Sequence, residues 1–168
     1  MHTLTRLGTS VAALAVAISP AATFAIADAA GQGGTTVVLD TDLRRCDFSR
    51  VNEAAWIPRA ALGSGSALIS TSGSRAVAQV HMTIPNAPGT HYDVGLIQEP
   101  RPSSATCGPG DPGTAFTGMD TDGAGNATVT VQDSLRQGTT GVWVIVERAN
   151  PNSQNPAEFY TSEFLVPA

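Results

Sequence analysis

The sequence predicts an all-β fold, an antiparallel sandwich or barrel of about seven to nine strands. Apolar residues of the 168-residue chain recur with period two in short stretches, which is the pattern of half-buried strands. Turn residues separate these stretches, since the chain has 17 Gly and 11 Pro but only 14% charged residues. This composition disfavours long charged helices, coiled coils and a membrane bundle. The length suits a single domain.

Residues 1–27 have the three parts of an export signal. One cation, Arg6, is followed by an apolar stretch at 11–18 and by small residues at Ala25 and Ala27. A Ser-Pro break after the apolar stretch favours a cleaved signal over an uncleaved anchor. No later stretch has the roughly 20 apolar residues that a membrane-spanning helix needs. We therefore expect a protein that is secreted, either free outside the cell or held non-covalently at the cell envelope.

Cleavage is expected before Asp28, which leaves residues 28–34 as a flexible lead-in and residues 35–168 as the β-sandwich domain. The two cysteines, Cys46 and Cys107, are predicted to form a disulfide, because an even number of cysteines in an exported domain indicates pairing. Closing this loop stabilises the fold by about 4 kcal/mol in the chain-entropy model. A reactive thiol pair is the alternative, but such pairs favour a Cys-x-x-Cys spacing.

The individual strands follow from the alternation of apolar and polar residues. They are expected at 35–43, 66–71, 76–84, 92–97, 114–121, 127–131, 141–147 and 159–166. The alternation within 76–84 places His81 on the polar face. Residues 141–147 are apolar on both faces, so this strand is expected in the centre of the fold.

Two further expectations concern the second half of the chain. The Asp122-Gly123 pair lies between two strand-like runs and predicts a hairpin turn. In the last strand the alternation predicts that Tyr160, Phe164 and Val166 face the core.

Two motifs carry a resemblance to known families. The run Pro-Gly-Thr-x-Tyr at residues 88–92 resembles that of fibronectin type III and related immunoglobulin-like sandwiches. In those families the tyrosine, here Tyr92, bonds through its hydroxyl to upstream backbone. Residues 121–128 resemble the Thr-Asp-x-x-Gly-x-Ala hairpins of bacterial immunoglobulin-like domains. Because the chain continues far beyond Tyr92, its strand order must differ from that of a fibronectin module.

As a whole, the leader, the single cysteine pair and these motifs resemble small secreted proteins of unknown function from mycobacteria and other actinobacteria. The resemblance implies an immunoglobulin-like, fibronectin III-like antiparallel β-sandwich and an extracytoplasmic location. It implies no activity.

The charge of the chain limits its partners. The formal net charge is −5 at pH 7 and the sequence pI is about 4.9. Phosphate backbones and anionic membrane surfaces are therefore repelled, which argues against nucleic acid as a partner.

One cluster of arginines is the main candidate for binding. Arg44, Arg45, Arg50 and Arg59 fall within sixteen residues, in and just before a long loop predicted at 46–64. That loop also holds Trp56, a candidate exposed aromatic anchor. A basic loop on an acidic protein predicts binding to a carboxylate-bearing or phosphorylated envelope polymer, or to a protein. The alternative is that these arginines pair with the acidic residues around them, Asp40, Asp42, Asp47 and Glu53.

Metal and cofactor chemistry has weak support. Asp120, Asp122 and Asn126 offer oxygen ligands of the kind that calcium prefers, but the segment fails the EF-hand pattern and is better explained as a turn. Outside the leader only His81 and His91 remain as imidazole ligands, which is too few for a zinc site. We therefore expect no cofactor.

Catalysis has only general candidates. His81 and His91 are the candidates for the base of a Ser/His/Asp set, but no Gly-x-Ser-x-Gly nucleophile motif is present. Paired carboxylates for glycoside cleavage would come from Glu99, Glu147, Glu158 and Glu163, without any indication of which pair. The sequence therefore favours a non-catalytic binding module over an exported hydrolase or a purely structural envelope component. An enzyme predicts a pocket that holds a histidine beside a carboxylate and a hydroxyl.

Overall fold

The structure is a computed structural model that describes residues 33–51 and 62–168. The chain divides into two units, residues 1–30 and residues 31–168, and the second contains every described residue. The predicted leader with its cleavage site, Trp56 and Arg59 lie outside the described residues.

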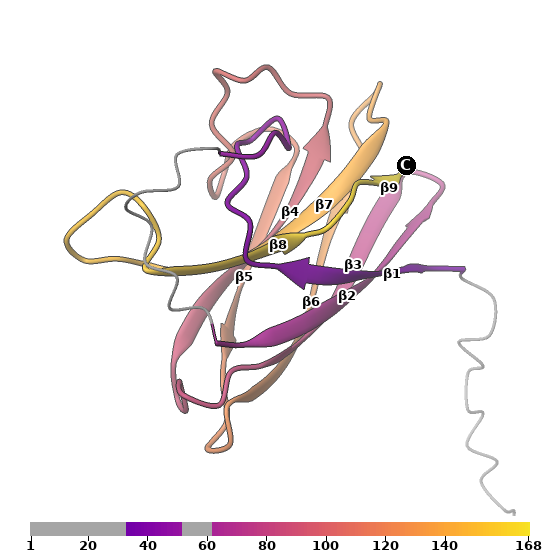
Figure 1. Ribbon diagram of the computed structural model, residues 1–168. Helices are drawn as coiled ribbons and strands as arrows, with labels where there is room; N and C mark the ends of the chain where they lie inside the picture. The colour runs from indigo at the N-terminus through magenta and orange to yellow at the C-terminus, as the bar shows by residue number, and fades with distance from the viewer. Residues whose placement is uncertain (1–32, 52–61) are drawn as a thin grey trace, which may run out of the picture. The chain divides into compact units, whose positions relative to one another are not determined.

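The described part of the chain is all-β and contains no helix. Its nine strands are β1 Thr35–Asp40, β2 Ser64–Ser72, β3 Arg75–Thr83, β4 His91–Glu99, β5 Thr114–Asp120, β6 Asn126–Ser134, β7 Gly141–Arg148, β8 Glu158–Ser162 and β9 Val166–Pro167 (Figure 1). The all-β class, the strand number and the antiparallel arrangement are confirmed. No helix of the described residues has the length and apolar character needed to cross a membrane.

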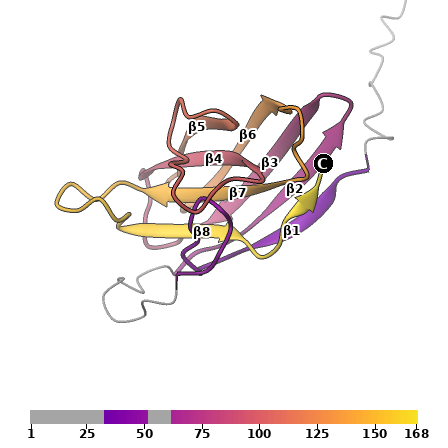
Figure 2. The same cartoon turned by 90° about the horizontal axis from the view of Figure 1, so that it is seen from above.

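The strands form one antiparallel sheet with the order β5-β4-β7-β8-β1-β2-β3-β6, and β9 pairs with β7. The pairing between β8 and β1 is short, since only Leu39 lies opposite Ser162 and Asp40 opposite Thr161. The two end strands, β5 and β6, contact each other, so the sheet folds around a shared core. In Figure 2, β4, β7 and β8 lie side by side while β1, β2 and β3 run obliquely to them. The immunoglobulin-like type of this fold stays a prediction.

The main core lies on the inner face of the sheet and draws on strands from the whole order. β3 illustrates its origin, because Ala76, Ala78, Val80 and Met82 are buried in alternation with exposed or half-buried residues. His81 is exposed on the outer face, as the alternation predicts.

A second apolar cluster lies on the outer face of β4 and β7. It consists of Ile97, Trp143 and Ile145, with partly buried Phe48, Cys107, Phe116 and Leu165 packed against it. Because this cluster covers the outer face, β7 is buried continuously from Gly141 to Val146. The prediction of a central strand covered on both sides is confirmed.

The predicted disulfide between Cys46 and Cys107 is also confirmed. It joins two segments that contribute to the cover of β7, residues 41–51 and residues 100–113. Phe48 of the first segment packs edge-on against Trp143, with ring centroids 5.5 Å apart. Removing either segment would expose the indole to water.

The last predicted strand is wrong in one respect. Residues 159–166 form two strands, β8 and β9, because the N–H of Glu163 bonds to the carbonyl of Val38 and the chain then returns to pair with β7. The step between the strands breaks the alternation. Tyr160 and Val166 are buried as expected, but Phe164 is 43% exposed and is not part of the core.

The predicted hairpin at Asp122-Gly123 is wrong as a pairing of strands. A tight turn does occur there, with Gly125 at φ 82° and the Asp122 carboxylate accepting the N–H groups of Ala124 and Asn126 at 2.8 Å. However, β5 pairs only with β4 and β6 pairs only with β3. The strands diverge because the two sides of the turn bond to different parts of the chain. The N–H of Thr121 donates to the carbonyl of Thr90, just before β4, whereas the carbonyl of Gly125 accepts the N–H of Ile84, just after β3.

Candidate binding site

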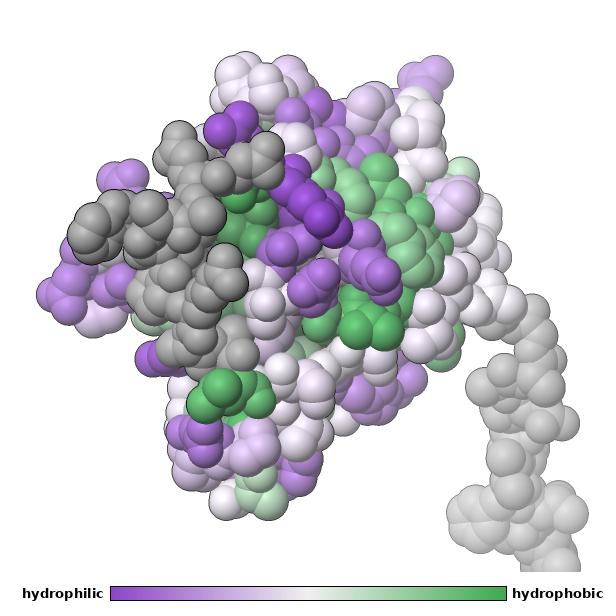
Figure 3. Space-filling view, in the orientation of Figure 1, coloured by the Kyte–Doolittle hydropathy of each residue, from purple (hydrophilic) through white to green (hydrophobic). Residues whose placement is uncertain are grey.

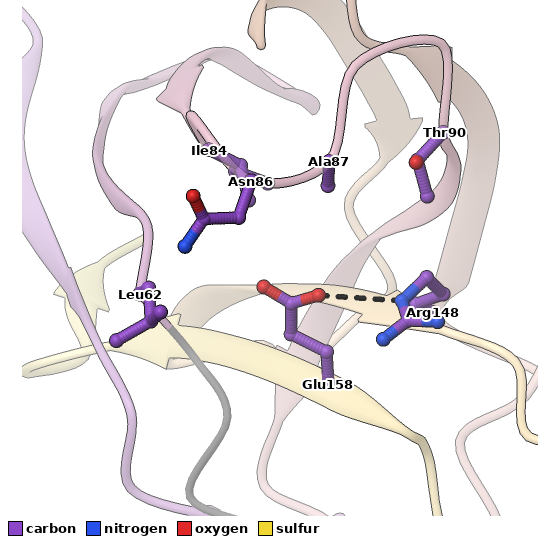
Figure 4. A pocket seen from close by; sticks show the side chains of 7 residues that line it. All are labelled: Leu62, Ile84, Asn86, Ala87, Thr90, Arg148 and Glu158. Atoms are coloured by element: carbon purple, nitrogen blue, oxygen red, sulfur yellow. Dashed lines mark hydrogen bonds and ion pairs between the residues drawn. The ribbon is translucent and has the colours of Figure 1, made fainter.

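A cavity of ≈ 190 Å³, which we call the Glu158 cavity, lies where β7 and β8 meet the connection between β3 and β4. Its lining consists of Leu62, Ile84, Asn86, Ala87, Thr90, Arg148 and Glu158 (Figure 4). Figure 4 shows the carboxylate of Glu158 and the amide of Asn86 reaching into the space between β8 and the 84–90 segment. The wall therefore combines polar groups from three parts of the chain with three apolar side chains.

Glu158 is the buried charge of this site. It is the first residue of β8, only 4% exposed, and it lies opposite Arg148 of β7 in the sheet register. Its Oε2 accepts the Tyr92 hydroxyl at 2.8 Å and the Arg148 Nε–H at 3.3 Å. Its Oε1 accepts the hydroxyl of Tyr160. These three donors compensate for the desolvation of the carboxylate, which would otherwise be costly.

The two tyrosines act as fixed donors to Glu158. Burial raises the pKa of Tyr92 and of Tyr160 well above the ordinary value of 10, and the hydrogen bond to Glu158 raises each pKa further. Both phenols therefore stay protonated at physiological pH. The Tyr160 hydroxyl also accepts the N–H of Gly63 at 3.0 Å, which ties the chain before β2 to the cavity.

The role expected for Tyr92 from the fibronectin-like motif needs correction. Its hydroxyl donates to the side chain of Glu158, 66 residues downstream, and not to upstream backbone. An ionised carboxylate is a stronger acceptor than a backbone carbonyl, which explains the choice of partner.

The remaining polar groups of the wall define what the cavity can bind. The Arg148 side chain is 39% exposed, and within the described residues only its Nε–H has a hydrogen-bond acceptor. The charges of Arg148 and Glu158 cancel, so the wall carries no net charge. Leu62 is exposed and offers apolar surface beside this pair, whereas Ile84 lines the cavity but is almost fully buried. Such a wall suits an uncharged group that both donates and accepts hydrogen bonds.

The arginines predicted to bind a partner are placed differently from one another. Arg44 is only 8% exposed, and it donates to the carbonyls of Ser162 at 3.0 Å, Glu163 at 2.9 Å and Phe48 at 3.3 Å. Its guanidinium also lies 3.9 Å from the centre of the Phe48 ring. Burial, followed by the nearby charge of Arg50, lowers the pKa of Arg44. The expectation for Arg44 is therefore revised, because this side chain holds the 41–51 segment against β8.

Arg45 and Arg50 are exposed. Arg50 forms an ion pair with Asp42, with Nε and Oδ2 3.0 Å apart, so the alternative of local pairing holds for this residue. Figure 3 shows polar and apolar surface interleaved over β1 and the neighbouring loop. The described part of the predicted basic loop thus offers one arginine, Arg45, that is exposed and forms no ion pair with described residues.

The two histidines lie on the surface, and neither lines the cavity. His81 shares a hydrogen bond of 3.0 Å with Thr128. His91 lies between Asp120, at 2.8 Å, and Asp93, at 3.7 Å. The hydrogen bond to Asp120 raises the pKa of His91. The pocket expected of a hydrolase, with a histidine beside a carboxylate and a hydroxyl, is therefore not what the Glu158 cavity provides.

The candidate calcium ligands are used within the protein. Asp120 bonds to His91, and the Asp122 carboxylate accepts backbone N–H groups that lower its pKa. Among the described residues no group of three or more His, Cys, Asp or Glu side chains is placed to hold a metal ion.

From the sequence, Glu158 is only one of four candidate glycosidase carboxylates. The structure places Glu147 and Glu158 on opposite faces of the sheet, because Glu147 is opposite Phe159 and Arg148 is opposite Glu158. One signal in the sequence was available: Glu158 and Tyr160 are two residues apart, so a strand puts both on the face that Tyr160 buries. Arg148 reaches Glu158 only because β7 pairs with β8, and no local sequence pattern predicts this contact.

Comparisons of the chain with protein-family models, with curated proteins and with solved structures find no match.

Proposed function

We propose that the protein is a non-catalytic binding module that acts outside the cell or at the cell envelope and holds an uncharged polar group of its ligand in the Glu158 cavity. The observation that carries this proposal is the Arg148–Glu158 pair in the cavity wall. A carboxylate that accepts three hydrogen bonds is a fixed acceptor, which suits recognition better than proton transfer.

The chemistry of the wall favours a hydroxyl-bearing ring such as one sugar unit. A hydroxyl group can donate to Glu158 and accept from Arg148 at the same time, and a second hydroxyl can bond to Asn86. The exposed apolar side chain of Leu62 suits the C–H face of such a ring. A volume of ≈ 190 Å³ limits the occupant to a small molecule or to a single unit of a longer polymer.

The proposed location rests on two features of the chain. The pattern of residues 1–27 resembles an export signal. The disulfide between Cys46 and Cys107 supports an oxidising compartment, since such bonds are rare in the cytosol.

Chemical-shift titration of the isotopically labelled chain tests the proposal. Glucose and N-acetylglucosamine, added up to about 50 mM, should shift the amides of residues 84–90, 148 and 158 in a saturable way. Asn86 is exposed at the cavity, so Asn86→Ala should keep the fold and weaken binding about 2- to 10-fold by removing one hydrogen bond. Asn152→Ala, the same change at an exposed position outside the cavity lining, is the matched control.

Three results would contradict the proposal. The first is the absence of saturable shifts with either sugar. The second is an equal effect of Asn86→Ala and Asn152→Ala on binding. The third is cleavage of oligomers of N-acetylglucosamine when these are incubated with the same protein, which would favour the exported hydrolase instead.

A further inference from the structure

A second hollow, of ≈ 400 Å³, lies on the disulfide-linked segment that follows β4. Its lining includes Arg101, Ser104 and Asp111 of the 100–113 segment and Arg136, which follows β6. The two arginines are 35 positions apart in the chain, so only the fold brings them to one hollow. This feature is separate from the Glu158 cavity, and the two share no lining residue.

Backbone carbonyls hold both guanidinium groups in place. Arg101 donates through Nη1 to the carbonyl of Pro112 at 2.8 Å and through Nη2 to the carbonyl of Thr106. Arg136 donates through Nη2 to the carbonyl of Gln98 at 3.1 Å. Carbonyl acceptors fix the orientation of a guanidinium group but leave its charge uncompensated.

Within residues 33–51 and 62–168 neither arginine forms an ion pair with a carboxylate, although the charge of Arg101 acts on Glu99, where it opposes the burial that raises the pKa of that carboxyl. The Nε–H of each is buried without a hydrogen-bond acceptor in this part of the chain. Asp111 is the one acidic residue of the lining, and its carboxylate accepts the N–H of Gly108 at 2.8 Å. The lining therefore carries two positive charges and one negative charge.

The hollow is also organised before any ligand arrives. Cys107 ties the segment to Cys46, and the Thr114 hydroxyl lies 2.8 Å from the carbonyl oxygens of both Gly108 and Asp111, which share its single proton. Gly113 allows Arg136 to approach, since a Cβ at this position would lie 2.2 Å from Arg136 Nε and the backbone φ is 72°. A site whose cations are already oriented loses little entropy on binding.

We propose that this hollow binds a singly charged oxyanion, the group present in both a carboxylate and a phosphodiester. The net charge of the lining matches one negative charge, and two guanidinium groups can donate to the two oxygens of such a group. This inference does not depend on the Glu158 cavity. It adds a second pair of arginines to the anion recognition that the sequence predicts at Arg44, Arg45, Arg50 and Arg59.

Titration with two small anions tests this site and distinguishes its sources. Sodium acetate represents a carboxylate and sodium dimethyl phosphate represents a phosphodiester, each added to the labelled full chain at an ionic strength kept constant with sodium chloride. Saturable amide shifts should occur at residues 101–113 and 136. The anion with the lower Kd identifies the group that the natural ligand carries.

Two variants and a matched control make the test specific. Arg136→Gln should raise the Kd at least about 5-fold, because one of two cations is lost. Arg75→Gln, the same change at an exposed arginine on β3, should leave the Kd unchanged. Ser104→Asp adds a negative charge at an exposed rim position and should abolish binding without removing any contact that holds the segment.

The outcomes that would overturn the proposal are equally specific. Shifts no larger than those caused by chloride alone would overturn it. An equal loss with Arg75→Gln and Arg136→Gln would show a general charge effect and not a site. If Arg136→Gln fails to fold, as judged by circular dichroism, unchanged anion binding by folded Ser104→Asp would still refute the site.

Discussion

The two halves of the sheet differ in what covers their outer faces. In the half formed by β1, β2, β3 and β6, which we call the open half, residues of β3 alternate between buried and exposed because water reaches the outer face. In the half formed by β4, β5, β7 and β8, the covered half, β7 is buried on both faces by the 41–51 and 100–113 segments. The strands of the sheet therefore form the core, whereas irregular segments and the ends of strands line the candidate sites.

The largest expected effect is on the outer cluster of the covered half. Trp143→Ala should lower the free energy of unfolding by about 3–5 kcal/mol, because Trp143 is fully buried against Phe48 and its indole N–H bonds to Glu99 at 3.0 Å. Leu68→Ala on the outer face of the open half should cost less than about 1 kcal/mol, because Leu68 is 41% exposed. Urea denaturation measures both, and equal costs would refute the distinction between the halves.

Reduction of the disulfide should have the next largest effect. Loss of the bond between Cys46 and Cys107 should cost about 2–4 kcal/mol, measured as a lower urea midpoint in the presence of a reducing agent. Because the bond joins the two covering segments, amide exchange should accelerate first at 100–113 and much less in β3. Uniform acceleration across both halves would contradict this account.

A change at Glu158 tests the buried network at the cavity. Glu158→Gln should cost about 2 kcal/mol at pH 7, because it weakens charge-assisted bonds from Tyr92, Tyr160 and Arg148. Glu163→Gln, the same change at an exposed position, is the control and should have little effect. Thermal melting of both variants is the measurement, and a Glu158→Gln variant as stable as its control would argue against the network.

The smallest effect has the opposite sign and concerns Glu147 on the outer face of β7. Burial, and then the like charge of Asp93, raises the pKa of Glu147 above its ordinary value of 4.5. The folded protein therefore binds the proton of the Glu147 carboxyl group more tightly than the unfolded chain does. The contribution of Glu147 to stability is greatest below the unfolded pKa and is lost as the pH rises through the higher pKa of the folded state.

Glu147→Gln should accordingly raise the melting temperature at pH 7 by a few degrees and change it little at pH 4. Glu147 has no hydrogen-bond or ion-pair partner among the described residues, so the substitution removes a cost without removing a contact. A lower melting temperature for the variant at pH 7 would show that the carboxylate is stabilising.

The sequence predicted the features that depend on local patterns. The alternation of apolar and polar residues predicted the strands and the exposure of His81. Apolar residues on both faces of 141–147 predicted that β7 is central, and the even number of cysteines predicted the disulfide. The features that it missed depend on long-range pairing. The end of β8, which exposes Phe164, follows from a bond between Glu163 and Val38 that no local pattern encodes.

The same distinction applies to the candidate sites. A cluster of arginines in the sequence predicted a binding loop, but Arg44 folds inward because the carbonyls at Ser162 and Glu163 lie within reach. Conversely, Arg101 and Arg136 are far apart in the sequence and line one hollow. Which arginines face solvent, and which of them lie together, therefore depends on the fold and not on their spacing in the sequence.

One chemical-shift map tests the central claim that the candidate sites belong to the covered half and the strand ends while the open half is a scaffold. The labelled chain is titrated with N-acetylglucosamine and then with sodium dimethyl phosphate in the same sample. We predict shifts at 84–90, 148 and 158 with the sugar and at 101–113 and 136 with the anion. Shifts concentrated on the outer face of β3 and β6, at 77–83 and 128–132, would contradict the account.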